Sequence, residues 1–220
     1  MSDVAEKLAI CVERGKVNKS APYPPDLKDQ DGADEIARQA LESGVEPDQI
    51  LEGCINGMDR IGEKFSQNKA FVPELLMAAK AMNAAMVHLK PYFQSGQVKR
   101  KGLFIIGTVA GDLHDIGKNL VAMVIEGGGY EVIDLGNDVS TEKFLNAVAE
   151  HQNCVVGLSA LLTTTMTNME GTVQAIKEKY PDVNVIIGGA PLTQEFADKI
   201  GADAYSPDPQ GALAFLNQNA

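Results

Sequence analysis

The sequence predicts a helical domain followed by a five-stranded, doubly wound parallel α/β domain. Apolar residues recur at helical spacing up to about residue 94, and short apolar runs alternate with helical stretches after residue 101. A Ser-Gly segment with three basic residues, within 94–101, separates the two patterns. The chain has 220 residues, of which 45% are hydrophobic, enough for a buried core. We therefore expect two domains, residues 1–98 and 99–220.

The helical domain is predicted from groups of apolar residues spaced three or four positions apart. These groups lie within residues 36–41, 50–61 and 75–89. Pro47 before Asp48 and Pro73 before Glu74 mark helix starts, because proline is favoured in the first helical turn. Residues 19–28 contain three prolines and are predicted to form a rigid connector.

Short apolar runs after the boundary are the predicted strands of the second domain. They are Leu103–Val109, Glu131–Leu135, Cys154–Leu162, Val183–Ile187 and Ala202–Ser206. The predicted helices are Lys118–Glu126, Thr141–His151, Thr167–Tyr180, Gln194–Ile200 and Gly211–Gln218. This alternation indicates a parallel sheet of the flavodoxin- or Rossmann-like type, in which ligands bind at the carboxyl ends of the strands. We expect the loops after the first, third and fourth strands to form the site.

Charge and cysteine content exclude several classes of function. The chain has 19 Lys and Arg against 30 Asp and Glu, a net charge of −11, which argues against a nucleic-acid partner. The longest uncharged apolar run, 102–111, is about half of the roughly 20 residues that a membrane span needs, and the acidic residues within 1–15 argue against a signal peptide. The three cysteines form no CxxC pair, so we expect no disulfide framework, no thiolate zinc site and a cytoplasmic location.

The loop after the first predicted strand, residues 107–117, carries the most distinctive side chains. It is not a phosphate-binding P-loop, because five residues separate Gly111 from Gly117 where a P-loop has four, and Asn119 follows Lys118. The chain also lacks a GxGxxG dinucleotide fingerprint.

This loop does place His114 two residues after Asp112. An imidazole that binds a metal through one nitrogen usually donates its other N–H to a carboxylate, and Asp112 is placed to accept it. Capping of the following helix by these two side chains is the alternative interpretation.

Two further elements lie at the ends of predicted strands. The segment Ser159-Ala-Leu161 begins after 41 residues beyond Gly117, and Gly188-Gly189 begins after 26 more. The pattern Asp-x-His-x-x-Gly, Ser-x-Leu and Gly-Gly at these intervals resembles the cobalamin-binding signature shared by methionine synthase, adenosylcobalamin mutases and corrinoid methyl carriers. The resemblance implies a cobalamin cofactor, methylcobalamin in its methylated form, with His114 as the lower ligand of the cobalt.

In that family the nucleotide base of the cofactor leaves the cobalt and enters a channel beside the sheet. The resemblance implies that Gly117, Gly188 and Gly189 leave room for this tail. It further implies that Ser159 hydrogen-bonds the nucleotide and that Leu161 lines the channel. Tight turns are the alternative explanation for the glycines. The loop residues expected to bind the cofactor are Gly111, Asp112, His114, Asp115 and Gly117.

Family members with a ligand triad place a hydroxyl after the carboxylate, and the resemblance puts Thr165 at that position, with Thr163 near the corrin edge. Methionine synthase has serine there, so the threonine is a departure that keeps the hydroxyl and restricts χ1. The alternative is that residues 163–165, all threonines, cap the next helix.

The helical domain resembles the cap that precedes the cobalamin domain of methionine synthase and of methyl-transfer corrinoid proteins. The resemblance rests on Asn56-Gly-Met-Asp-Arg-Ile-Gly-Glu-Lys-Phe65 and on Phe71-Val-Pro-Glu-Leu-Leu-Met77. It implies that Phe65 and Val72 shield the methyl group, although methionine synthase has leucine at the position of Val72. Packing in the helical core is the alternative role for both. The resemblance covers nearly all of the chain beyond about residue 30.

Chain length separates the subfamilies of this resemblance. A mutase needs a barrel of roughly 200 residues or more, and methionine synthase needs further catalytic domains. A cap followed by a cobalamin domain is the arrangement of corrinoid methyl carriers. The resemblance therefore implies a corrinoid subunit with no catalytic residue of its own, whose methyl donor is a methylamine, methanol, a betaine or a methoxylated aromatic compound.

The implied carrier accepts a methyl group on Co(I) from a substrate-specific methyltransferase. It delivers this group from methyl-Co(III) to a second methyltransferase that acts on a folate or a thiol coenzyme, and a reductive activation protein is a further expected partner. One alternative is a cobalamin-dependent sensor; a DNA-binding sensor would need a basic module, whereas residues 1–30 are short and acidic. The other alternative is a flavodoxin-like response module without a cofactor.

Overall fold

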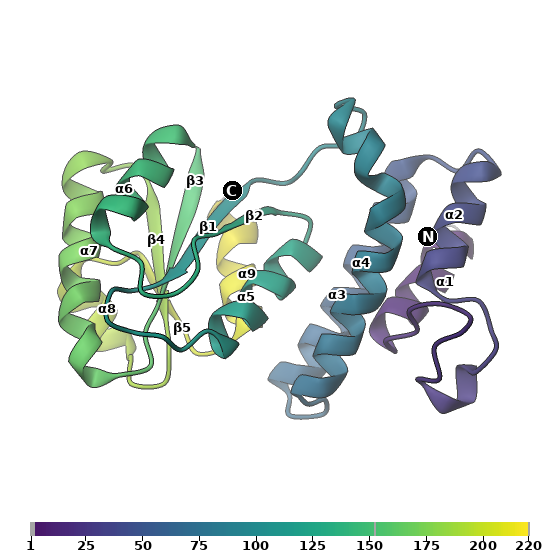
Figure 1. Ribbon diagram of the computed structural model, residues 1–220, viewed down its shortest axis with the longest axis horizontal. Coiled ribbons are helices and arrows are strands. Elements are labelled where there is room, and N and C mark those ends of the chain that lie inside the picture. The colour runs from purple at the N-terminus through teal and green to yellow at the C-terminus, as the bar shows by residue number, and fades with distance from the viewer. Residues whose placement is uncertain (1–2, 152, 220) are drawn as a thin grey trace. The chain divides into compact units, whose positions relative to one another are not determined.

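The computed structural model describes residues 3–151 and 153–219 (Figure 1). The chain forms two compact units. The first extends to Arg100 and includes Gly127–Gly129, and the second consists of Lys101–Glu126 and the chain from Tyr130 onward. The division after Arg100 falls within the segment that interrupts the hydrophobic pattern of the sequence.

The first unit is built from helices that pack around an apolar core. They are α1 (Asp3–Glu13), α2 (Ala33–Glu42), α3 (Pro47–Ser66) and α4 (Val72–Gln94), with a short 3-10 turn η1 (Pro25–Leu27) before α2. Pro47 is the first residue of α3, and the Glu74 carboxylate accepts the N–H of Phe71 at 2.8 Å, which caps α4. Sequence analysis missed α1, although its buried residues have helical spacing: Ala5, Leu8, Ala9 and Val12.

Glycines bring α1 and α3 close together. Gly53 and Gly57 of α3 are buried. A Cβ on Gly57 would lie 2.7 Å from the carbonyl oxygen of Ala9 and 2.6 Å from the Cβ of Val12. The two helices can approach this closely because α3 has no side chain at these positions.

The second unit contains a parallel sheet in the strand order β2-β1-β3-β4-β5. The strands are β1 (Leu103–Thr108), β2 (Glu131–Asp134), β3 (Cys154–Ser159), β4 (Asn184–Gly188) and β5 (Ala204–Ser206). This is the strand order of flavodoxin-like folds, so the predicted doubly wound parallel sheet is confirmed.

Helices cover both faces of this sheet (Figure 1). Helices α5 (Ile116–Gly127) and α9 (Pro209–Asn219) lie on one face, and α6 (Thr141–Glu150), α7 (Met166–Lys179) and α8 (Gln194–Ile200) lie on the other. The chain therefore leaves the neighbouring strands β1 and β3 toward opposite faces. This switch point at the carboxyl ends of the strands is where open α/β sheets bind ligands.

The end of β3 differs from the sequence prediction for a physical reason. The apolar run continues to Leu162, but the strand ends at Ser159. The backbone N–H groups of Leu161 and Leu162 donate to the Asp112 carboxylate instead of to a neighbouring strand. A side chain from the loop after β1 therefore fixes where β3 stops.

None of the helices within residues 3–151 and 153–219 combines the length and the hydropathy that crossing a lipid bilayer requires.

We expect Gly57→Ala to lower the free energy of unfolding by about 1–3 kcal/mol, because the added methyl group overpacks the contact between α1 and α3. Gly171→Ala in α7 is the matched control: an added Cβ there meets nothing within 4 Å, so helix propensity is expected to leave stability unchanged or raise it by up to about 1 kcal/mol. Urea unfolding followed by circular dichroism measures both changes. Equal stability of the two variants would contradict the close helix contact.

Candidate functional site

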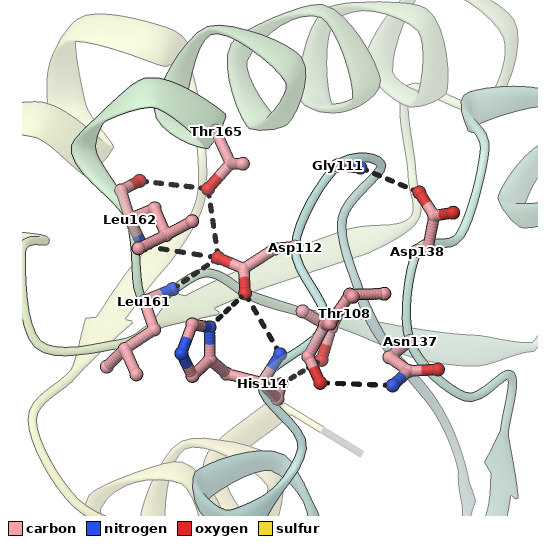
Figure 2. Close-up of polar contacts among 10 residues, drawn as sticks. Thr108, Gly111, Asp112, His114, Asn137, Asp138, Leu161, Leu162 and Thr165 are labelled. Carbon is pink, nitrogen blue, oxygen red and sulfur yellow. Dashed lines mark hydrogen bonds and ion pairs between the residues drawn. The ribbon is translucent and has the colours of Figure 1, made fainter.

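The loop between β1 and α5 is held in one conformation by polar side chains from outside it (Figure 2). The side chains that bond its backbone come from Thr108, Asn137 and Asp138, which Figure 2 shows, and from Asn168. The Thr108 hydroxyl donates to the carbonyl oxygen of His114 at 2.9 Å, and the Asp138 carboxylate accepts the N–H of Gly111 at 2.7 Å. Gly111 has a φ of +83°, a conformation that favours glycine.

The carboxylate of Asp112 lies at the centre of the site and is fully buried. Its Oδ1 accepts the backbone N–H of His114 at 3.1 Å and lies 2.7 Å from Nδ1 of the same residue. Its Oδ2 accepts the N–H groups of Leu161 at 2.7 Å and Leu162 at 3.2 Å, and lies 3.0 Å from the Thr165 hydroxyl. One carboxylate thereby joins the loop after β1 to the end of β3.

These contacts decide the charge of Asp112. Burial by itself raises the pKa of a carboxyl group, but the hydrogen bonds from Leu161, His114 and Thr165 outweigh this effect and hold the pKa of Asp112 well below its usual range. Asp112 is therefore ionised at neutral pH.

The ionised carboxylate in turn fixes the proton of His114. A carboxylate only accepts hydrogen bonds, so Nδ1 must carry the hydrogen that joins it to Asp112. In the neutral ring Nε2 then keeps its lone pair. The side chain is 50% exposed, and Figure 2 shows Nε2 turned away from Asp112. This is the arrangement of a histidine that ligates a metal with a carboxylate behind it.

His114 offers a metal one nitrogen ligand, so a bare metal ion would need further ligands from other side chains. Among residues 3–151 and 153–219, no group of three or more His, Cys, Asp or Glu side chains is placed to hold a bare metal ion. A metal at His114 therefore fits a chelate that brings its own equatorial ligands, as a corrin ring does for cobalt.

The surface around the imidazole fits such a chelate. Large apolar side chains next to His114 and at the end of β3 are between 40% and 76% exposed: Leu113, Ile116, Leu161 and Leu162. Exposed apolar groups gathered in one place mark a binding surface. Their position matches the need to cover a broad apolar macrocycle around a single nitrogen ligand.

A cavity of about 670 Å³ extends from this loop along the face of the sheet that α5 and α9 cover. The predicted residues that line it are His114, Asp115, Gly117, Ser159, Leu161, Gly188 and Gly189. Its volume is typical of a site for a small molecule or cofactor. The structure therefore places a cavity where the sequence predicts a channel for the cofactor tail.

The space around the backbone differs among the three glycines of the predicted channel. A Cβ on Gly189 would lie 1.8 Å from the carbonyl oxygen of Ala160, and its φ is +141°, so the fold itself requires glycine there. A Cβ on Gly188 would lie 3.3 Å from the carbonyl oxygen of Ser206. A Cβ on Gly117 would meet no atom within 4 Å, although Gly117 lines the cavity. Gly117 thus leaves open space that the protein does not fill.

The predicted threonines differ in their surroundings. Thr165 is buried, and its hydroxyl proton is shared between Asp112 and the carbonyl oxygen of Leu162, which lies 2.9 Å away. Thr163 is exposed at the start of the 3-10 turn η2 (Thr163–Thr165), outside the cavity. The structure thus brings Thr165, but not Thr163, into the network of Asp112 and His114.

Phe65 and Val72 belong to the helical unit. Phe65 lies in the last turn of α3, and Val72 is the first residue of α4. Both side chains are partly buried.

Several residues of the site were missed by sequence analysis. Asn137, Asp138 and Asn168 hold the histidine loop, and Leu162 bonds Asp112 through its backbone. The available signal was the polar pair Asn137-Asp138 directly after the second predicted strand, at the edge where the site lies. Asn168 and Leu162 carry no comparable signal.

Comparisons with known proteins agree with this geometry. A family model described as a B12 binding domain matches residues 102–214, and a second B12 binding domain model matches residues 29–90. The trimethylamine corrinoid protein of Methanosarcina barkeri is 41% identical over 191 residues, which are 84% of this chain and 88% of that protein. The dimethylamine corrinoid protein 1 of Methanosarcina acetivorans is 41% identical over 182 residues, 81% of this chain and 85% of that protein.

Solved structures agree as well. A cobalamin-binding protein from Desulfitobacterium hafniense has a TM-score of 0.78 at 28% identity, with all of both chains covered. A chain of the methanol:cobalamin methyltransferase complex of Methanosarcina barkeri has a TM-score of 0.79 at 26% identity, covering 98% of this chain and 80% of that one. The predicted corrinoid cofactor is thereby confirmed, and the interpretation as a cofactor-free response module is wrong. The chain belongs to the B12-binding family and, within it, to the corrinoid proteins of methyltransferase systems.

Proposed function

We propose that this protein is a corrinoid methyl carrier that receives a methyl group from one methyltransferase and gives it up to another. The observation that carries the proposal is the imidazole of His114, whose Nδ1 is held by Asp112 and whose Nε2 is left free beside an exposed apolar surface. When bound, the corrinoid supplies the cobalt atom that carries the methyl group. The methanol:cobalamin methyltransferase complex supports a methyltransferase as partner.

The residues of this chain bind and orient the cofactor. Nε2 of His114 is the proposed lower ligand, and Asp112 keeps the proton on Nδ1, which makes Nε2 a better donor. Leu113, Ile116 and the two leucines after β3 are proposed to contact the corrin face. The cavity beside α5 is proposed to take the nucleotide tail, with Ser159 in its lining as a hydrogen-bond partner.

The helical unit is proposed to cover the reactive face of the corrinoid between transfers, with Phe65 and Val72 shielding the methyl group from water. This proposal rests on the resemblance of residues 56–65 and 71–77 to a cap, and the second B12 binding domain model, which matches residues 29–90, supports it.

The proposed methyl donor is a methylamine. Relatives named for trimethylamine and for dimethylamine are about 40% identical over most of this chain, which supports this donor class. The proposed acceptor is a folate or a thiol coenzyme, methylated by the second methyltransferase. A reductive activation protein is proposed to reduce the cobalt of the bound corrinoid again after accidental oxidation.

The test of the carrier function is methyl uptake. Reduced, cobalamin-loaded protein mixed with a trimethylamine methyltransferase and trimethylamine is expected to change its corrinoid absorbance as dimethylamine is released. Methanol with a methanol methyltransferase is the comparison arm and is expected to give no change. A response only in the methanol arm, and not in the trimethylamine arm, would refute the donor assignment. The absence of a response to any methylated compound supplied with its methyltransferase would refute the carrier function.

The ligand assignment has its own test. His114→Ala is expected to bind cobalamin at least about tenfold more weakly, because the metal loses its protein ligand. Its cobalt(II) form is expected to lose the nitrogen hyperfine splitting from imidazole in the electron paramagnetic resonance spectrum. His151→Ala, at the end of α6 and outside the cavity, is the control and is expected to keep both properties. An unchanged spectrum in His114→Ala would exclude this ligand.

The open space at Gly117 gives a further prediction. Gly117→Ala is expected to weaken cobalamin binding roughly tenfold, because its methyl group enters space proposed for the tail. The melting temperature of the corrinoid-free protein is expected to be unchanged or slightly higher, since the methyl group meets no protein atom within 4 Å. Gly171→Ala makes the same substitution outside the cavity and is expected to bind cobalamin normally. Unchanged affinity in Gly117→Ala would place the tail elsewhere.

A further inference from the structure

We propose that the cavity selects corrinoids by their nucleotide base, accepting a base with a hydrocarbon ring edge, such as a benzimidazole, and disfavouring a purine. This inference rests on the proposed function, in which the nucleotide tail occupies the cavity. It adds a specificity that arises from the inner lining of the cavity.

The strands present two rows of residues to the cavity. The outer row, at the carboxyl ends of the strands, consists of Ser159, Gly188 and Ser206. The inner row lies two residues earlier and consists of Ile106, Gly157 and Ile186. Because side chains alternate along a strand, residues two apart point to the same face of the sheet. The side-chain hydroxyl groups of the two rows are therefore confined to the outer row, and the inner row is apolar.

The floor of the cavity is aromatic. Phe104 lines the cavity and is buried. A Cβ on Gly157 would lie 2.3 Å from Cζ of Phe104, so the ring lies directly over the backbone of β3. Gly157 thus permits a flat apolar floor, and Leu120 and Val121 of α5 line the same cavity.

The polar side chains of the lining come from outside the inner row, and several already have hydrogen-bond partners. His114 and Asp115 belong to the histidine loop, and the buried ammonium group of Lys118 in the first turn of α5 donates to the side chains of Asp134 and Asn119. The Ser206 hydroxyl donates to the carbonyl oxygen of Asp208 at 2.6 Å, and the Asp208 side chain accepts the N–H of Gly211 at 2.8 Å.

Tyr205 on β5 lines the cavity, but its hydroxyl group does not make the inner cavity polar. Its side chain packs against the core on the opposite face of the sheet. Within the described part of the chain, the inner row therefore offers a buried base no side-chain hydrogen-bond partner.

This lining distinguishes the two kinds of base. A benzimidazole has a hydrocarbon six-membered ring, which gains contact with Phe104 and the isoleucines. A purine has ring nitrogens and, in adenine, an exocyclic amine at the corresponding edge. Burial would strip these groups of water without giving them partners. An apolar pocket discriminates against an analogue with added polar groups by up to roughly a hundredfold, so a preference of at least about tenfold is within this range.

The test is a comparison of dissociation constants for the corrinoid-free full chain, measured by absorbance titration. The probes are cobalamin, whose base is dimethylbenzimidazole, the cobamide whose base is adenine, and cobinamide, which has no nucleotide. Cobalamin is expected to bind at least about tenfold more tightly than either of the others.

The outcomes separate this inference from the proposed function. Equal binding of cobalamin and the adenine cobamide, with cobinamide much weaker, would overturn the selection and leave the carrier function intact. Equal binding of all three would overturn it too, because the tail would then not be recognised. Failure of all three to bind would overturn both proposals.

Substitutions in the inner row test whether its apolar side chains cause the preference for cobalamin. Ile186→Thr places a hydroxyl in that row and is expected to narrow the preference for cobalamin over the adenine cobamide severalfold. Val185→Thr is the matched control, because this buried residue of β4 belongs to the core on the other face and does not line the cavity. It is expected to leave the preference unchanged.

Ile106→Thr introduces the hydroxyl from the neighbouring strand and serves if Ile186→Thr does not fold, as judged by thermal unfolding without corrinoid. An unchanged preference in the folded inner-row variants would overturn the role of this row.

Discussion

The buried carboxylate of Asp112 is the contact on which the rest of the site depends. One of its oxygens fixes the proton of the His114 ring, and the other takes the N–H groups of Leu161 and Leu162 where β3 ends. Only an acceptor with several lone pairs meets all of these donors at once. The residue that orients the imidazole of His114 is thus also the residue that fixes the backbone at the end of β3, at the switch point of the sheet.

At Asp112, hydrogen bonds lower the pKa more than burial raises it, and this has a consequence for the protonation of His114. A buried carboxyl group that kept its proton would leave Nδ1 of His114 free to become an acceptor and Nε2 to carry the hydrogen. The donors from the end of β3 and from Thr165 hold the pKa of Asp112 low and exclude that alternative. The availability of the Nε2 lone pair is therefore a property of two loops together, although the imidazole belongs to only one of them.

The strand–helix alternation predicted the sheet, because hydrophobic periodicity is local in the sequence. The motif predicted the hydrogen bond between Asp112 and His114, since the two residues are neighbours in the loop. It did not predict the end of β3, where the apolar run continues past Ser159 and the competing acceptor lies 49 residues away from Leu161. The contacts of Asn137 and Asn168 with the loop are non-local for the same reason.

The glycines of the motif differ in whether the fold itself requires them. Gly189 has no alternative residue because of the backbone of Ala160, whatever the cavity holds. A Cβ on Gly117 would meet no protein atom within 4 Å, so packing within the protein does not require glycine there, and the proposed cofactor tail supplies a reason for it. The same reasoning applies to the exposed side chains of Leu113 and Ile116. Their contact with water is unfavourable in free energy, and a ligand that covered them would remove it. The features that packing of the fold does not require, the open space at Gly117 and the exposed Leu113 and Ile116, are therefore the ones on which the proposed cofactor site rests.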